Sequence, residues 1–199
     1  MAYLPGNSNA TRSLLKIIMT GVVLCAAGTV QAEDFALSLT DDSAKAQLNL
    51  THPSDELAFG LGYTYHTGSR HIGNADFHAQ GRTAIGNIPA TVRVGARTMY
   101  FRDSPFEGGA LAPGGYLRLN IPDVPGLSVS GSLHASPTVL SFGDADGMVN
   151  FESTVNYRVI RNAEFFAGYR YVNASLDVAE NRDDLRLEEG FLGGLRIVF

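Results

Sequence analysis

Polar and apolar positions alternate along most of the chain after residue 33, and this alternation is typical of a β-strand with two different faces. In residues 57–66 (LAFGLGYTYH), every second side chain is large and apolar or aromatic, and the positions between are small or polar. Residues 127–135 and 148–160 repeat the alternation. Runs of about ten residues suit a tilted membrane strand, whereas strands of soluble proteins average about five or six. No segment after residue 33 has clear helical spacing, so we expect an all-β chain.

The alternation predicts ten strands. They span residues 34–40, 44–51, 57–66, 74–82, 90–101, 111–121, 127–135, 148–160, 163–172 and 186–199. Short turns rich in Pro, Gly, Asn and Asp, such as residues 122–126, alternate with longer polar loops, such as residues 102–110 and 173–184. Outer-membrane barrels combine short periplasmic turns with longer external loops and have an even number of strands. We therefore predict a transmembrane, antiparallel, up-and-down β-barrel of ten strands.

Two other architectures fit parts of this pattern. Because the first two predicted strands are short and joined by the tight connection DDS, eight strands with a separate N-terminal hairpin are an alternative. A soluble β-sandwich would also alternate, but its aromatic residues would pack between two sheets. Here the aromatics of the apolar face gather at strand ends, as the interfacial girdles of a membrane barrel do. They are Tyr63, Tyr65, Phe77, Tyr100, Tyr169 and Tyr171 at the external ends and Phe35, Tyr157, Phe165 and Phe199 at the periplasmic ends.

The N-terminal segment has the composition of a secretory signal. Arg12 and Lys16 precede the apolar run IIMTGVVLCAAG, and Ala32 is the small residue at the expected cleavage point. The run is shorter than the roughly 20 residues of a spanning helix, so we expect cleavage and not anchoring. The prediction is a cleaved signal peptide over residues 1–32 and an outer-membrane β-barrel domain over residues 33–199.

Composition narrows the class of partner. The signal segment holds two of the 15 Lys and Arg residues and none of the 20 Asp and Glu residues, so the barrel domain carries 13 cations, 20 acids and a net charge of −7. An acidic exported domain without a basic cluster argues against nucleic acid as a partner. The one cysteine of the chain lies in the signal segment, so no disulfide is expected in the barrel.

The last predicted strand ends on an aromatic residue. In the terminal sequence GGLRIVF, Leu195, Ile197 and Phe199 share the apolar face. The pattern Gly194-x-x-Ile197-x-Phe199 looks like the C-terminal signal through which outer-membrane proteins reach the barrel assembly machinery. We therefore expect a monomer in the outer membrane of a Gram-negative bacterium. Its expected partners are outer-membrane lipid, lipopolysaccharide and, during biogenesis, the assembly machinery.

Several segments resemble the YfaZ-type outer-membrane proteins, a family of small barrels. They are the export signal, the segment GLGYTYH after an early strand, the basic strand VRVGARTMYF, the strand FFAGYRY and the terminal GGLRIVF. The resemblance extends over essentially the whole of residues 33–199. It implies an outer-membrane location and a barrel fold, and it brings no catalytic residues with it.

Polar side chains of the alternating pattern are expected to face the barrel lumen, and arginine dominates among them. The predicted lumen residues are Arg93, Arg97, Arg118, Glu152, Arg158, Arg170 and Arg196, with Glu164, His66 and His78 on the same face. One hypothesis is that the arginines select anions, as charged rings do in pores. The other is that they pair with Glu152 and Glu164 and fill the lumen, as side chains fill eight-stranded barrels. Six arginines against two clear acids would leave unpaired positive charge, which requires water or anions nearby.

Candidate catalytic and metal-binding residues are few. His134 and Ser136 share one face of a strand, as in the His/Ser pair of outer-membrane lipid A deacylases, but Pro137 follows the serine and no third, orienting acid is identified. The segment DADG (144–147) lacks the further ligand spacing of a calcium loop, and the histidines fit no zinc pattern. We predict no metal, no cofactor and no enzymatic activity.

The predicted function is a small porin-like channel with an arginine-rich lumen. The alternative is a closed structural barrel that interacts with other molecules through its external loops. A lipid hydrolase at the barrel rim, using His134 and Ser136, is a third possibility.

Overall fold

The computed structural model describes residues 31–68, 70–178 and 181–199. The predicted signal peptide lies outside the described residues apart from Gln31 and Ala32, with which the first strand begins. The strands are β1 (Gln31–Leu39), β2 (Ser43–Thr51), β3 (Leu57–His66), β4 (Arg70–Ile85), β5 (Ile88–Asp103), β6 (Phe106–Asn120), β7 (Leu127–Ser136), β8 (Ser141–Gly143), β9 (Ala145–Ile160), β10 (Ala163–Val178) and β11 (Asn181–Val198). One short 3-10 helix, η1 (Thr138–Leu140), precedes β8.

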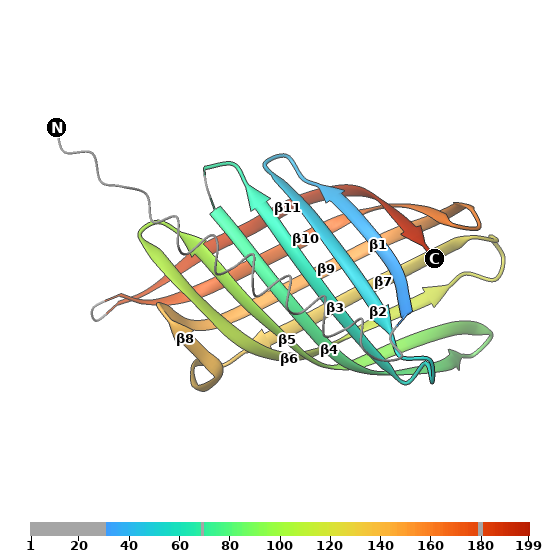
Figure 1. The fold of residues 1–199 in the computed structure, drawn as a ribbon, viewed down its shortest axis with the longest axis horizontal. Helices are drawn as coiled ribbons and strands as arrows, with labels where there is room; N and C mark the ends of the chain where they lie inside the picture. The colour runs from blue at the N-terminus through green and yellow to red at the C-terminus, as the bar shows by residue number, and fades with distance from the viewer. Residues whose placement is uncertain (1–30, 69, 179–180) are drawn as a thin grey trace.

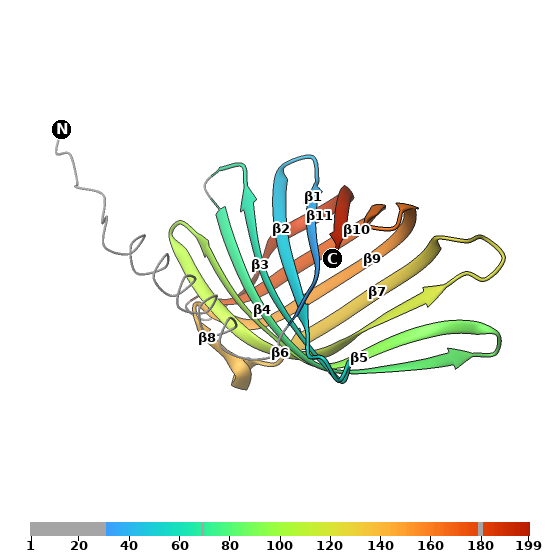
Figure 2. The same ribbon diagram turned by 45° about the vertical axis from the view of Figure 1, so that its right-hand side comes forward.

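Ten of the described strands close into one antiparallel ring (Figure 1). Strands β1 to β7 pair in chain order, β7 pairs with β9, and β10 and β11 follow. The ring closes where β11 pairs with β1, from Asp34↔Val198 to Leu39↔Gly193, and Figure 2 shows these two strands side by side. The three-residue β8 pairs with β6 at the rim. The prediction of an all-β antiparallel barrel of ten strands is confirmed, and the eight-stranded alternative is wrong because β1 and β2 belong to the ring.

The strands differ in length, and this corrects the predicted loops. Strands β1, β2, β3 and β7 have 9 or 10 residues, whereas the other ring strands have 15 to 18. The predicted loops over residues 102–110 and 173–184 are mostly strand, since β5 runs to Asp103 and β10 pairs with β11 as far as Val178↔Asn181. The outward side chains of these extensions, such as Arg102, are polar, and their apolar side chains, such as Ala174 and Leu176, are buried inside the barrel. A membrane strand is recognised by an apolar outward face, so the sequence pattern did not reveal these extensions as strands.

The start of β1 and the end of β11 lie at the same end of the barrel as the short turns between strands. There, β4 and β5 are joined through residues 86–87, β9 and β10 through residues 161–162, and Val198 bonds to the Asn162 carbonyl. The hairpin of β5 and β6 and strand β8 lie at the opposite end, on the left in Figure 1, with the C-terminus on the right. We call the two ends the terminal end and the hairpin end.

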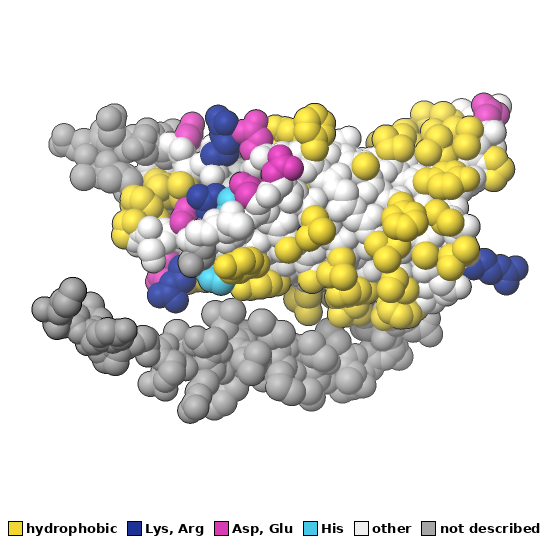
Figure 3. Space-filling model, turned by 90° about the horizontal axis from the view of Figure 1, so that it is seen from above, with side chains coloured by type: hydrophobic (Ala, Val, Ile, Leu, Met, Phe, Trp, Pro, Cys, Tyr) yellow, Lys and Arg dark blue, Asp and Glu magenta, His cyan; other side chains and the backbone are white. Residues whose placement is uncertain are grey.

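The outer wall of the barrel is apolar. Side chains that point outward remain exposed although they are large and hydrophobic, with Val94 64%, Leu133 55% and Phe191 81% exposed. Figure 3 shows hydrophobic side chains spread over the wall, most of the charged side chains at the hairpin end on the left, and a few at the terminal end on the right. No helix among the described residues is long and apolar enough to cross a membrane.

The inside of the barrel is divided into two zones. At the hairpin end, inward side chains form a buried cluster that we call the apolar plug. It consists of Ile72, Met99, Phe101, Ala110, Ala145, Met148, Val172, Ala174, Leu176 and Leu187. The strand face that carries Arg93 and Arg97 in β5 also carries Met99 and Phe101 farther along, so the polar face turns apolar toward the hairpin end. The rest of the lumen is polar and holds the candidate site.

Candidate functional site

The polar zone contains a cavity of about 590 Å³, which we call the lumenal cavity. It reaches the terminal end, where the exposed residues Thr83 and Pro89 beside the β4–β5 turn line it. It extends inward to Arg170, and none of the plug residues lines it. Phe101 and Leu187 of the plug are each 0% exposed. The lumenal cavity therefore opens at the terminal end and is blind toward the hairpin end.

All seven residues proposed from the sequence to line the lumen lie around this cavity. They are Arg93, Arg97, Arg118, Glu152, Arg158, Arg170 and Arg196. Side chains of a strand point alternately to its two faces, so Arg93 and Arg97 of β5 share one face. That face points inward, because the other face carries the exposed apolar side chains of the wall, such as Val94.

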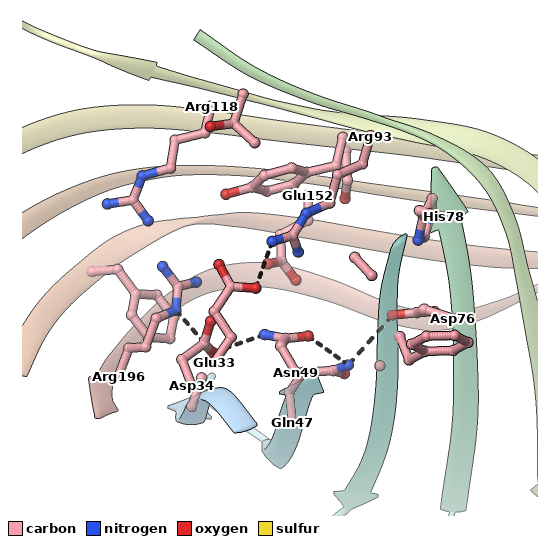
Figure 4. A pocket seen from close by; sticks show the side chains of 18 of the residues that line it. Glu33, Asp34, Gln47, Asn49, Asp76, His78, Arg93, Arg118, Glu152 and Arg196 are labelled. Atoms are coloured by element: carbon pink, nitrogen blue, oxygen red, sulfur yellow. Dashed lines mark hydrogen bonds and ion pairs between the residues drawn. The ribbon is translucent and has the colours of Figure 1, made fainter. Parts of the chain in front are cut away.

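Near the terminal end, arginines reach across the lumen to acids on distant strands. Arg93 of β5 donates from Nη2 to Oε2 of Glu33 in β1 at 2.8 Å. Arg118 of β6 donates from Nη1 and Nη2 to both oxygens of Glu164 in β10. Figure 4 shows Arg93 beside Glu33, with Arg118 and Arg196 directed into the same space. These contacts join opposite walls of the barrel.

The middle of the lumen holds a denser layer of ion pairs. Arg97 forms a two-pronged pair with Asp76, with N–O distances of 2.6 and 2.9 Å, and also donates to Asn150 across the lumen at 2.9 Å. Arg170 donates to Glu152 at 2.7 Å and to Glu188 at 3.0 Å. Such two-pronged and shared arrangements are the strong form of arginine–carboxylate contact.

The lumen is richer in acid than we expected from the sequence. Besides Glu152 and Glu164, the carboxylates of Glu33, Asp34, Asp76 and Glu188 each form an ion pair with a lumen arginine. The expectation of two clear acids was therefore wrong. Lys45 adds a cation 4.0 Å from Glu152. Among the described residues, Arg158 is the lumen arginine that forms no ion pair.

Glu188 reaches the lumen because β11 contains a β-bulge. Val172 of β10 is paired with Glu188 and the next residue, Asn173, with Arg186, so Leu187 is the extra residue. As a result two consecutive side chains turn inward, Leu187 into the plug and Glu188, 3% exposed, into the ion-pair layer. Strict alternation cannot predict this, since it would place only one of the two inside.

Arg70 of β4 forms hydrogen bonds across the lumen with the bulge in β11. Its Nη1 donates to the Leu187 carbonyl at 2.6 Å and to the Arg186 carbonyl at 3.1 Å. Its Nε and Nη2 contact Asp103 of β5, each at 2.7 Å. The carbonyl of the bulge residue Leu187 thus accepts a hydrogen bond from a charged donor of β4. Through its contacts with Leu187 and Asp103, Arg70 links β4 to β11 and β5 at the hairpin end.

Two buried histidines form another link across the lumen. Nε2 of His78 and Nε2 of His134 are 2.9 Å apart, and the rings meet edge to face. Gly114 stands opposite His134 in the β6–β7 pairing, where an added Cβ would lie 2.7 Å from the imidazole. The glycine is therefore required for the close approach of ring and backbone.

The proposed hydrolase pair is not assembled. His134 contacts His78, while the Ser136 hydroxyl donates to the Pro137 carbonyl and contacts Ser141. Both residues are buried in the lumen, His134 at 1% and Ser136 at 7% exposure, instead of lying at an exposed rim.

The three residues of the proposed assembly signal lie in the closing strand and at its end. Gly194 pairs with Ser38 and Ile197 with Phe35 across the β1–β11 seam. The side chains of Ile197 and Phe199 are 42% and 71% exposed on the outer wall. The aromatic end of the chain is thus at the terminal end, beside the seam.

Comparison with solved structures finds barrels of low similarity. One similar structure is a KdgM porin in complex with disordered oligogalacturonate. Its sequence is 10% identical to this chain, the TM-score is 0.47, and the match covers 85% of this chain and 99% of the porin. A second KdgM porin structure has 9% identity and a TM-score of 0.42 at the same coverage. The NanC porin has 10% identity and a TM-score of 0.39, covering 84% of this chain and 98% of that one. No curated protein matches the sequence.

The comparison with protein families gives a positive result over nearly the whole chain. The family described as YfaZ precursor matches residues 14–199, a range that includes every described strand. The resemblance noted in the sequence is confirmed, and the chain belongs to the YfaZ family.

Proposed function

We propose that this protein is a membrane-spanning, porin-like barrel of a Gram-negative outer membrane whose channel is closed at rest. The apolar outer wall supports the membrane location, because large hydrophobic side chains such as Phe191 and Val94 are exposed on strands long enough to cross a bilayer. In that setting outer-membrane lipid and lipopolysaccharide surround the wall.

The orientation follows from where the charges lie. The extensions at the hairpin end carry exposed ion pairs on their outer surface, including Arg102–Glu107 and Arg186–Glu189. Charged groups are costly on the lipid face of a barrel, so these hairpins project into water. The terminal end carries the short turns and the C-terminal strand that would be presented to the barrel assembly machinery. We place the terminal end in the periplasm and the hairpin end outside the cell.

The blind lumenal cavity is the observation on which the closed state rests. Its wall is polar and arginine-rich, as an aqueous path for anions would be. It stops at the plug, where Phe101 and Leu187 leave no exposed surface. A hydrophobic constriction blocks ions because water does not wet it. Opening therefore requires plug side chains to move aside.

Planar-bilayer conductance of the refolded chain tests this proposal. We expect the wild-type barrel to be almost silent and the double variant Phe101→Ala/Leu187→Ala to conduct in discrete, anion-selective steps. The control is Leu133→Ala, which shortens a side chain that is 55% exposed on the outer wall and should leave the barrel silent. Folding of each variant is checked by heat-shifted gel mobility. Steady conductance of the wild type would contradict the closed state.

A second candidate is the closed structural barrel, and the contacts across the lumen favour it. Arg93–Glu33, Arg97–Asn150 and Arg118–Glu164 cross the polar zone of the lumen and link strands that are not neighbours in the ring: β5 with β1, β5 with β9 and β6 with β10. If the folded double variant is also silent, the ion-pair layer itself seals the lumen. The exposed hairpins would then be the working surface.

A further inference from the structure

Three arginines surround a single buried carboxylate in the lumenal cavity. Glu164 of β10 is 0% exposed and stands directly between two arginines of the neighbouring strands, Arg158 of β9 and Arg196 of β11. Directly paired residues of adjacent strands have Cβ atoms about 5 Å apart, so their side chains are neighbours. Arg118 reaches the same carboxylate from β6, on the opposite wall. Three positive charges thus meet one negative charge.

The nearby acids do not balance this group. Asp34 lies 3.5 Å from Nε of Arg196, and that buried Nε has no hydrogen-bond partner among the described residues. Glu33 is already engaged by Arg93 and by the Thr51 hydroxyl. Arg158 has no ion-pair partner in the described part of the chain. Glu164 and Asp34 against three arginines leave one positive charge in excess.

The three arginines have more donors than Glu164 can accept, and all three residues line the lumenal cavity. A guanidinium group has five N–H donors, and the two oxygens of Glu164 accept from Arg118 and from Nη1 of Arg196. Arg118 and Arg196 point into the cavity from different sides in Figure 4, and Arg158 also lines it. A cavity of about 590 Å³ is within the range of about 300–1,000 Å³ that ligand pockets have.

We propose that Arg118, Arg158 and Arg196 form a binding site for a small anion bearing a carboxylate or phosphate group. This proposal rests on the proposed function in one respect, the orientation of the barrel, which places the open end of the lumenal cavity in the periplasm. The plug closes the cavity on the other side, so the anion enters from the terminal end and not through the hairpins. Glu164 accepts hydrogen bonds from Arg118 and Arg196 and so competes with the ligand for these two arginines, and Arg158 provides the charge that the ligand neutralises.

The limited excess charge restricts the ligand. Asp34 and Glu33 stand on the same wall and repel further negative charge, so the site favours one or two anionic groups over a polyanion. The cavity wall also offers the amides of Asn49 and Asn120. A small ligand with additional hydrogen-bonding groups therefore fits better than a purely apolar acid.

Isothermal titration calorimetry on the refolded full-length barrel in a zwitterionic detergent tests the site. The probes are citrate and inorganic phosphate in low-salt buffer, with glucose as the neutral comparison. We expect at least one anion to bind and glucose not to bind. Arg158→Gln should weaken binding by about tenfold or more, as the loss of a charge-assisted contact does. Arg161→Gln removes a cation exposed in the adjacent turn and should change the affinity less than about twofold.

A second variant separates binding from folding. Glu164→Gln removes the internal carboxylate that competes for Arg118 and Arg196, so a correctly folded variant should bind the anion more tightly than the wild type. A purely structural role for these residues predicts weaker binding in both Arg158→Gln and Glu164→Gln. That result, equal weakening by Arg158→Gln and Arg161→Gln, or no binding of either anion by the wild type would overturn the proposal.

The outcomes also distinguish the site from the channel. Citrate binding without phosphate binding identifies a carboxylate ligand, and the reverse identifies a phosphate. Anion binding by a barrel that stays silent after plug truncation would leave the site standing and reject the channel. Conductance through the plug variant with no measurable anion binding would reject the site and leave the channel.

Discussion

Replacement of Arg170 by methionine tests how much the buried ion-pair layer contributes to stability. The Arg170 side chain is 3% exposed and donates to three groups: Glu152 at 2.7 Å, Glu188 at 3.0 Å and the Ser38 hydroxyl at 2.9 Å. Methionine keeps most of the length of the side chain and removes its charge and donors. Among the described residues, Glu188 would then keep only the Ser43 hydroxyl, and Glu152 only Lys45 at 4.0 Å.

The expected loss of free energy of unfolding follows from leaving Glu152 and Glu188 without their arginine partner. Removing one partner of a buried ion pair costs about 3–5 kcal/mol, because the remaining charge stays buried without compensation. We therefore expect the free energy of unfolding of Arg170→Met to fall by about 3–5 kcal/mol. Because the chain has no tryptophan, the assay is urea unfolding from phosphatidylcholine vesicles followed by far-ultraviolet circular dichroism. It is run at pH 8 to keep the carboxylates ionised.

Two further variants make the result interpretable. Arg186→Met removes an exposed pair with Glu189, whose side chains are 66% and 35% exposed, and should cost less than about 1 kcal/mol. Adding Glu188→Gln to Arg170→Met removes one orphaned charge and should recover part of the loss, with a coupling of about 0.5–3 kcal/mol. If Arg170→Met costs no more than Arg186→Met, or if the double variant is strictly additive, the layer does not stabilise the barrel as argued.

Three other outcomes are expected. Phe101→Ala empties part of the plug and should lower the free energy of unfolding in the same assay by about 3–5 kcal/mol, whereas Val94→Ala on the outer wall should cost far less. Phe199→Ala should reduce the fraction of chains that reach the folded, heat-shifted form in the outer membrane, and an unchanged fraction would reject the assembly signal. Intact mass spectrometry of the exported protein should show a chain that begins at Glu33, and a mass that retains residues 1–32 would contradict the predicted signal peptide.

The class of fold could be predicted from the sequence because strand periodicity is a local property. In residues 57–66, the polarity of each side chain indicates which face of the strand it occupies, and the observed β3 has the same bounds as the prediction. Strand lengths were predicted poorly at the hairpin end, where Arg102 and Asp184 are exposed and the apolar side chains of the same strands point inward into the plug. There the alternation is reversed, with apolar side chains inside and polar side chains outside, so a search for an apolar outer face does not find these parts of the strands.

The candidate site was predictable only in part, for a geometric reason. Alternation placed Arg118 and Glu164 on the inward face, but these partners are 46 positions apart and on opposite walls. Ser43 and Glu188 are 145 positions apart, and Glu188 faces inward only because of the bulge at Leu187. A periodic pattern gives the direction of a side chain and not the residue that it meets.

The sequence by itself determined an all-β chain with an export signal, an apolar outer face and an inward row of arginines, because each of these depends on residue type and spacing along one strand. The tertiary structure alone decided that these arginines are largely paired, that Arg158 forms no ion pair with any described residue, and that the lumenal cavity is closed at the plug. Those properties arise when ring closure sets the height and opposing wall of every inward side chain. The same closure brings Phe101 of β5, Met148 of β9 and Leu187 of β11 into one plug, which no single strand pattern contains.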